Sequence, residues 1–232
     1  MFEFSPAEWT AIALSAKVAT TAVVFSLPLA IALGYLLARK SFPGKALLDG
    51  VLHMPLVLPP VVTGYLLLLA FGRQGPIGAL LYDWFGVTLA FRWTGAALAA
   101  AVMGFPLMLR AIRLSFEAID RRLEGAASTL GASPAWTFAL VSLPLALPGM
   151  LAGAILCFAK ALGEFGATIT FVSNIPGETQ TIPSAIYAYT QVPGGESGAL
   201  KLTCVSIAIA LLALFAAEVL GARAQRRIAT FE

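Results

Sequence analysis

Long runs of apolar residues recur along the whole chain and set its predicted architecture. A helix needs about 20 mostly apolar residues to cross the hydrocarbon core of a bilayer, because each residue rises only about 1.5 Å. The stretches that approach this length cover residues 15–38, 51–71, 94–112, 141–165 and 202–220. The pattern predicts an all-α membrane protein with about five transmembrane helices, organised as a single domain over residues 1–232.

A further apolar stretch over residues 76–91 does not fit a membrane span. It is interrupted by Asp83 and Gly86, and it carries Tyr82 and Trp84, which are residue types that favour the headgroup boundary. We therefore expect residues 72–93 to form one external loop, with residues 76–91 as an interfacial loop or helix within it. A second external loop is expected over residues 171–200, and a cytoplasmic loop over residues 113–140.

The basic residues orient these spans, because short cytoplasmic loops of membrane proteins carry an excess of Lys and Arg. Five crossings place three basic clusters on one side of the membrane: Arg39, Lys40 and Lys45, then Arg110, Arg113, Arg121 and Arg122, then Arg223, Arg226 and Arg227. The other side holds Arg73, Arg92 and Lys201. The distribution predicts an external N-terminus and a cytoplasmic C-terminus.

Composition supports a membrane protein and excludes several other classes. Soluble domains are roughly 45–50% apolar and about 25% charged, whereas this chain is 59% hydrophobic and 12% charged. Its net charge of +3 lies in short clusters and not in a basic stripe interleaved with aromatic residues, so we expect no nucleic-acid partner. Cys157 and Cys204 fall inside apolar runs without metal-ligand spacing, and we predict no metal site.

The sequence also argues against catalysis by this chain. No phosphate-binding G-x-x-x-x-G-K-[ST] motif occurs, so any energy from ATP must come from another subunit. A membrane enzyme would need a cluster of polar catalytic groups, and the single histidine, His53, has no nucleophile or carboxylate pattern around it that would supply one. We predict no catalytic residues and no cofactor bound by this chain.

Two consecutive prolines, Pro59 and Pro60, lie in the middle of the second predicted span. Proline removes a backbone donor and kinks a helix. Within a membrane, the freed carbonyl groups are tolerated only where neighbours or a water-filled cavity satisfy them. We expect a helix break here, and the two prolines are candidates for lining a translocation path.

The predicted cytoplasmic loop contains signals for two short helices. Residues 110–130 have helical composition with charges on one face, and Gly131 then offers a helix C-terminus. Ser133 followed by Pro134 fits an N-cap and the first position of a new helix. Small residues such as Ala126 and Ala127 would let the pair seat closely in a groove of a partner protein. An ordinary solvated connector fits the same composition.

The loop resembles a motif of the integral membrane subunits of binding-protein-dependent ABC importers of the type I fold. That motif is E-A-A, three residues, G, nine residues, then I-x-L-P, and the matching positions here are Gly125, Ala126, Ala127, Gly131, Val141, Leu143 and Pro144. Gly125 stands where the motif has its acidic residue, and Glu124 precedes it. The resemblance implies a coupling helix that sits in a cleft of a nucleotide-binding subunit.

Residues 163–187, GEFGATITFVSNIPGETQTIPSAIY, are similar to the molybdate permeases of that family. The resemblance covers nearly the whole chain and is strongest from Glu124 to Gly198. It implies an importer of molybdate into the cytoplasm, located in a bacterial inner membrane. Sulfate, thiosulfate and tungstate permeases share the layout and remain alternatives, as does an ATP-independent channel or carrier.

Lys160 and Glu164 lie four residues apart near the outer end of the fourth predicted span. One interpretation is a mutually neutralising pair on one helix face that helps to hold two helices together. The other is that Lys160, together with the polar side chains of Thr168, Ser173 and Asn174, guides a passing oxyanion. Ionisable residues in membrane segments usually face a protein interior or an aqueous path, which fits both interpretations.

The family resemblance also implies the partners. It predicts a homodimer of permease subunits with two cytoplasmic ATPase subunits, which would hold ATP and Mg²⁺, and an external oxyanion-binding protein. The implied mechanism is alternating access, with the chain embedded in the lipid bilayer.

Overall fold

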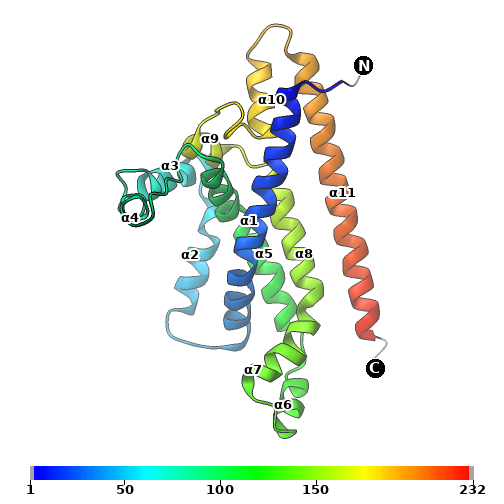
Figure 1. The fold of residues 1–232 in the computed structure, drawn as a ribbon. Helices are drawn as coiled ribbons and strands as arrows, with labels where there is room; N and C mark the ends of the chain where they lie inside the picture. Colours follow the sequence, from blue (N-terminus) through cyan, green and yellow to red (C-terminus); the bar gives the residue numbers. More distant parts are fainter. Residues whose placement is uncertain (1–2, 230–232) are drawn as a thin grey trace.

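The computed structural model describes residues 3–229, excepting the side chains of residues 217 and 220–229, and that part of the chain is built of helices joined by loops (Figure 1). The helices are α1 (Pro6–Arg39), α2 (Lys45–Val57), α3 (Pro60–Phe71), α4 (Pro76–Phe85), α5 (Trp93–Glu117), α6 (Arg121–Thr129), α7 (Pro134–Thr137), the π-helix η1 (Phe138–Ser142), α8 (Leu143–Leu162), α9 (Gly166–Val172), α10 (Ile182–Thr190) and α11 (Glu196–Ala229). The predicted all-α class is confirmed.

Four helical segments are long and apolar enough to cross a membrane: Pro6–Arg39, Trp93–Glu117, Pro134–Leu162 and Glu196–Ala216. A fifth candidate is the pair α2 and α3, whose axes are bent by 116°. The break falls between Val57 and Pro60, where the two prolines predicted it. The expected span over residues 51–71 is therefore two helices at a steep angle and not one continuous rod.

Helix α1 begins nearer the N-terminus than the apolar pattern suggested. Ser5 and Glu8 form a capping box, in which Glu8 N donates to Ser5 Oγ at 3.2 Å and Ser5 N donates to Glu8 Oε2 at 2.6 Å. Pro6 occupies the first turn, where its missing N–H has no cost. Hydrophobicity alone places the start near residue 15 because Glu8 interrupts the apolar run, although the Ser-x-x-Glu capping signal is present.

Helices α1, α5 and α8 form the centre of the bundle and approach closely through small residues. A Cβ atom added to Gly104 of α5 would lie 2.7 Å from Cys157 Sγ, and one added to Gly153 of α8 would lie 2.9 Å from Met108 O. A Cβ atom added to Gly34 of α1 would lie 2.9 Å from Ile112 Cγ2. Small residues at such crossings let helix backbones pack against one another inside a membrane.

Helix α9 packs against α3 next to the proline break. A Cβ atom on Gly166 would lie 2.7 Å from Pro60 Cβ, and Gly64 faces the backbone of Ala167 with the oxygen 2.4 Å from an added Cβ. These contacts bring the proline break and the segment after α8 together, although they are about 100 residues apart in the sequence.

We expect Gly64→Ala to destabilise the protein, because the new methyl group would overlap the Ala167 backbone, which has no flexible side chain that can move aside. Overpacking of this kind costs about 1–3 kcal/mol. The matched control is Gly50→Ala in α2, where an added Cβ meets no atom within 4 Å and helix propensity improves. Thermal melting of the purified protein in detergent should show a lower midpoint for the first variant and an unchanged or higher one for the second.

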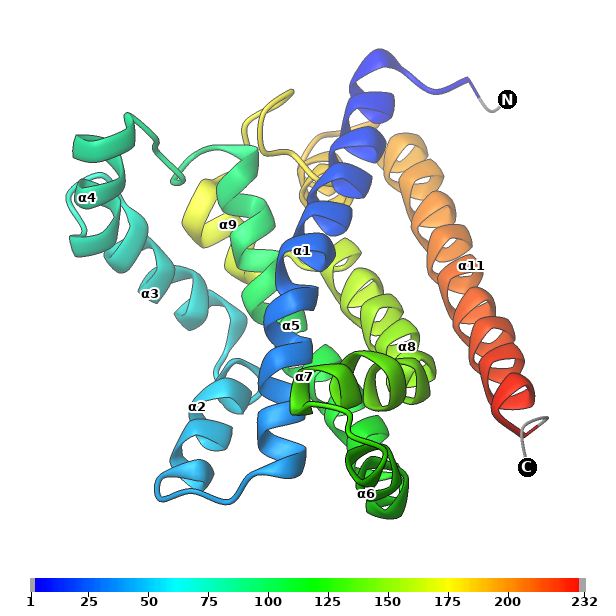
Figure 2. The same ribbon diagram turned by 60° about the horizontal axis from the view of Figure 1, so that its bottom comes forward.

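The two ends of the bundle differ in the charges of their loops. The α1–α2 loop, α6 and α7 lie at one end, and the N-terminal residues, α10 and the start of α11 lie at the other (Figures 1 and 2). The first end carries two of the basic clusters used to predict orientation. The side chains of the third, at Arg223, Arg226 and Arg227, lie outside the described residues.

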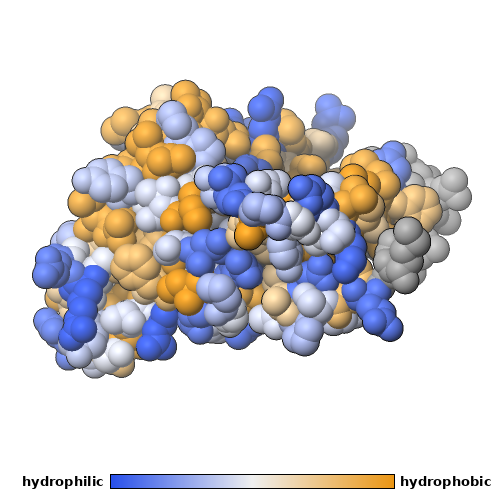
Figure 3. All heavy atoms as spheres, turned by 90° about the horizontal axis from the view of Figure 1, so that it is seen from above, coloured by the Kyte–Doolittle hydropathy of each residue, from blue (hydrophilic) through white to orange (hydrophobic). Residues whose placement is uncertain are grey.

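The expected external loops contain short helices. The 72–93 loop includes α4, and the 171–200 loop includes α10, which begins behind Thr181 with Pro183 in its first turn. Helix α4 fits the helical alternative for residues 76–91, whereas α10 is too short for apolar-run length to detect. In the view from above, hydrophilic residues lie near the middle and along the lower edge of the face, and apolar residues gather mainly at the upper left (Figure 3).

Candidate functional site: the helix pair between α5 and α8

The helix pair α6 and α7 is shaped by local capping interactions. Asp120 caps the start of α6 by accepting a hydrogen bond from Arg122 N at 2.9 Å. At its end, Gly131 N donates to Ser128 O and Ala132 N donates to Ala127 O, both at 3.0 Å, with Gly131 at φ +88°. This is the Schellman arrangement, in which a left-handed residue ends the helix.

The predicted helix–glycine–helix form is confirmed in its second half. Ser133 caps α7 by accepting from Trp136 N, and Pro134 is the first residue of the helix. The first half differs, because α5 continues to Glu117 and a separate cap at Asp120 starts α6. Composition predicts one helical stretch over residues 110–130, because a turn of three residues is too short to interrupt the helical composition visibly.

The surface of α6 is open and apolar in part. None of its residues is buried, Leu130 just after its end is 89% exposed, and Leu123 and Trp136 are exposed as well. A Cβ atom at Gly125 or Gly131 would meet nothing within 4 Å. Of the predicted coupling residues, Gly125, Ala126, Gly131 and Pro144 are exposed, and Ala127 and Leu143 are partly buried. Exposed large apolar side chains next to small ones are suited to contact with another protein.

Glu124 points into the bundle and not away from it. Its Oε1 accepts from Arg39 Nε at 3.1 Å and from Ser142 Oγ at 2.7 Å, and Arg39 Nη2 lies 3.0 Å away. The side chains of Arg39 and Glu124 are 7% and 18% exposed. Arg39 also donates to Ile119 O at 3.2 Å. The carboxylate displaced by one position from the motif therefore joins α6 to the end of α1 and to η1.

The segment after α7 connects the helix pair to the bundle. The π-helix η1 precedes Leu143 and Pro144 at the start of α8. Its Phe138 ring stacks edge-on against Tyr35 of α1, with ring centroids 4.8 Å apart, and Leu143 packs into the same cluster. A displacement of α6 and α7 would thus reach both α1 and α8.

Lys160 and Glu164 form the predicted ion pair, with Lys160 Nζ 2.7 Å from Glu164 Oε2. They do not share one helix, because α8 ends at Leu162 and Glu164 lies in the turn that leads to α9. Glu164 Oε1 accepts from Ala167 N at 2.9 Å and so caps the start of α9. The Glu164 side chain is 1% exposed and that of Lys160 is 33% exposed.

The other candidates for a path are placed around α9. Pro60 contacts Gly166, and Pro59 and Pro60 are exposed at the break. Thr168 is buried and its hydroxyl donates to Phe165 O at 2.9 Å, so it is bonded to its own helix. Ser173 follows α9 at φ +65°, an unusual conformation for serine, and Asn174 Oδ1 is buried without a hydrogen-bond partner among the described residues.

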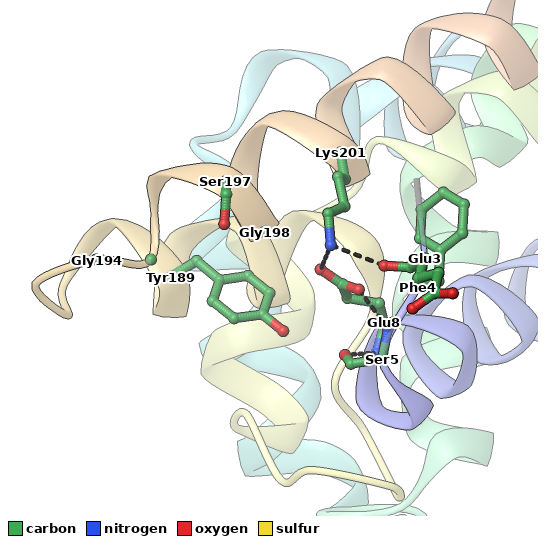
Figure 4. Close-up of a pocket in the computed structure, with 10 residues that line it drawn as sticks. Glu3, Phe4, Ser5, Glu8, Tyr189, Gly194, Ser197, Gly198 and Lys201 are labelled. Atoms are coloured by element: carbon green, nitrogen blue, oxygen red, sulfur yellow. Dashed lines mark hydrogen bonds and ion pairs between the residues drawn. The ribbon is translucent and has the colours of Figure 1, made fainter. Parts of the chain in front are cut away.

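A separate recess of about 380 Å³ lies at the opposite end of the bundle, between the N-terminal residues and the start of α11 (Figure 4). Lys201 reaches into it, donates to Glu3 O at 2.9 Å and pairs with the buried Glu8 at 3.6 Å. The charges of its buried residues are already matched within the fold. These contacts fasten α11 to α1 and explain why Glu8 is tolerated inside the protein.

Sequence reasoning missed Arg39 and Ser142 as parts of the site. The sequence predicts Arg39 only as a loop charge, because its partner Glu124 lies 85 residues away. Ser142 sits 18 residues from Glu124, inside a run otherwise read as a span. No local signal links these positions, because the contacts arise from the packing of α1 against the end of α5.

Comparison with known proteins agrees with this geometry. A family described as binding-protein-dependent transport system inner membrane component matches residues 30–226. The chain is 61% identical to the molybdenum transport system permease protein ModB of Escherichia coli K12, over 95% of this chain and 96% of that protein. It is 57% identical to the ModB protein of Haemophilus influenzae, over 95% and 96% of the two chains.

A solved bacterial ABC transporter involved in the import of the polysaccharide alginate has the same fold. It aligns with a TM-score of 0.70 at 14% identity, over 96% of this chain and 80% of that chain. The fold is thus the type I importer fold that the loop motif implied. This chain belongs to the family of inner membrane components of binding-protein-dependent transport systems, as a multi-pass membrane protein.

Proposed function

We propose that this chain is the membrane-spanning subunit of an ATP-driven importer that moves molybdate into the cytoplasm. The observation that carries the proposal is its 61% identity to a molybdenum permease over nearly the full length of both chains. The exposed helix pair α6–α7 supports it, because an importer of this family needs a surface on which an ATPase can act.

The proposed assembly is a homodimer of this chain with two cytoplasmic ATPase subunits and an external binding protein. One copy supplies only four or five spans, so a pathway between two copies related by a two-fold axis is economical. Exposed apolar side chains along α11, including Ile207, Leu211 and Phe215, leave ample surface for lipid and for a second copy. We place α6 and α7 on the cytoplasmic side and the N-terminus outside.

In the proposed mechanism, ATP and Mg²⁺ bind to the partner ATPases and this chain holds no cofactor. Closure of the ATPases brings the two α6–α7 pairs together. The motion passes through η1 into α8 and opens the pathway outward, where the binding protein delivers the anion. Hydrolysis then reopens the inner face. This chain contributes the docking surface and the path, and the hydrolytic chemistry belongs to the other subunit.

We further propose that Lys160, near the turn between α8 and α9, guides the oxyanion as it passes. Its side chain is partly exposed, and its charge is shared with a carboxylate 2.7 Å away. A partly neutralised cation suits transport, because a site that binds too tightly would not release the ion. Pro60 lies against Gly166, two residues after Glu164, and Pro59, Ser173 and Asn174 are further candidates.

Uptake into proteoliposomes that contain the permease, the ATPase and the cognate binding protein tests the proposal. We expect ATP-dependent accumulation of labelled molybdate, inhibited by excess molybdate far more strongly than by equal excesses of sulfate. Tungstate should compete well, because it is a tetrahedral dianion of nearly the same size. Preferential competition by sulfate would identify a sulfate permease, and accumulation without ATP would identify a channel or carrier.

A further inference from the structure

Helix α6 has few attachments to the rest of the protein. It buries none of its own residues, and its two neighbouring turns, at residues 118–120 and 130–133, are short loops. A helix that docks on a moving partner can drive the bundle only if the bundle is fastened to it. Specific polar contacts must therefore attach α6 to the bundle, because packing of buried side chains contributes little.

The contacts converge on the side chain of Arg39, the last residue of α1. Its guanidinium donates to Glu124 on α6 and to Ile119 O in the turn after α5, and Ser142 of η1 donates to the same carboxylate oxygen. One cluster thus joins α1, the α5–α6 turn, α6 and η1. At 7% exposure, the Arg39 side chain is shielded from water, so its charged hydrogen bonds are stronger than those of an exposed pair.

We propose that Arg39 and Glu124 are positioning residues that transmit movement of α6 to the transmembrane helices. The inference rests on the proposed docking of an ATPase on α6. It assigns to Glu124 a role inside this chain, instead of a contact with the ATPase. The C-terminal end of α1 is then the first part of the bundle to move when α6 moves. Arg39 donates from two different nitrogens of its planar guanidinium, Nε to Glu124 and Nη2 to Ile119 O, and lysine has only one nitrogen to offer.

The test uses the complete complex in proteoliposomes and measures ATPase retention, ATP hydrolysis and molybdate uptake on the same preparations. Arg39→Ala and Glu124→Gln should retain the ATPase, because the exposed face of α6 is unchanged. Molybdate moved per ATP hydrolysed should fall at least about fivefold, the lower end of typical coupling between sites. Glu124→Gln keeps the side-chain shape and can still accept from Ser142, so it carries the test if Arg39→Ala does not assemble.

The exchanged pair, Arg39→Glu with Glu124→Arg, should recover part of the lost coupling, which independent roles of the two residues would not predict. The matched control is Glu117→Ala, which removes a carboxylate that pairs with Arg113 on the same helix and leaves in place the Arg113–Asp49 pair that joins α5 to α2. Its uptake per ATP should equal that of the unaltered chain.

Unchanged uptake per ATP in both single variants would overturn the inference, as would an exchanged pair no better than the singles. Loss of the ATPase from the single variants would also overturn it, by showing that the pair acts on docking and not on transmission. Failure of the unaltered chain to retain an ATPase would contradict the proposed function itself, and the inference would fall with it.

Discussion

Gly131→Val is expected to abolish the stable association of this chain with its ATPase. Gly131 has φ +88° at the end of α6, a conformation that costs an L-residue roughly 1–2 kcal/mol and is worse for a β-branched one. The Schellman bonds that end α6 depend on this conformation. The valine would therefore redirect the chain after Leu130 and add bulk to the proposed docking surface. Co-purification of the ATPase with the tagged permease measures the effect.

Gly177→Val is the matched control for this experiment. Gly177 has φ +80°, and a Cβ atom there meets nothing within 4 Å, so the substitution imposes similar strain without a clash. It lies in the loop after α9, far along the chain from α6. We expect this variant to retain the ATPase. A Gly131→Val protein that bound the ATPase and transported molybdate normally would show that docking does not use this segment.

The parts of the site that sequence could predict are those fixed by neighbours in the chain. Gly131, Ser133 and Pro134 act through hydrogen bonds and backbone angles that span at most five residues, so their types and spacing disclose the turn. The break at Pro59 and Pro60 is likewise local, because proline removes a donor wherever it stands. The 116° bend is not local, since it depends on how α3 packs against α9.

The inward direction of Glu124 illustrates what sequence could not provide. The motif implies only a coupling helix in a cleft of the ATPase, and the fold shows Arg39 and Ser142 beside the Glu124 carboxylate. Apolar composition determines the length of a membrane span, but caps and ion pairs determine where its helix begins and ends. This is why α1 starts at Pro6, with Glu8 paired to Lys201, and why α8 ends before Glu164.

The Lys160–Glu164 pair has a structural and a transport interpretation, and one set of variants separates them. Lys160→Ala should reduce molybdate uptake at least about tenfold. It removes the cation proposed to guide the anion and leaves the buried Glu164 carboxylate uncompensated, which costs roughly 1–3 kcal/mol after allowance for the one-third exposure of Lys160. Uptake at saturating ATP measures the combined effect.

The double variant Lys160→Ala with Glu164→Gln removes the uncompensated charge, while the glutamine oxygen can still accept from Ala167 N and cap α9. Its thermal stability should return toward that of the unaltered protein, because neither remaining group is charged. If Lys160 guides the oxyanion, uptake must stay low in this variant and recover in Lys160→Arg, which restores the charge. Full uptake by the double variant would show that the pair has a structural role only, because transport would then not require a cation at this turn.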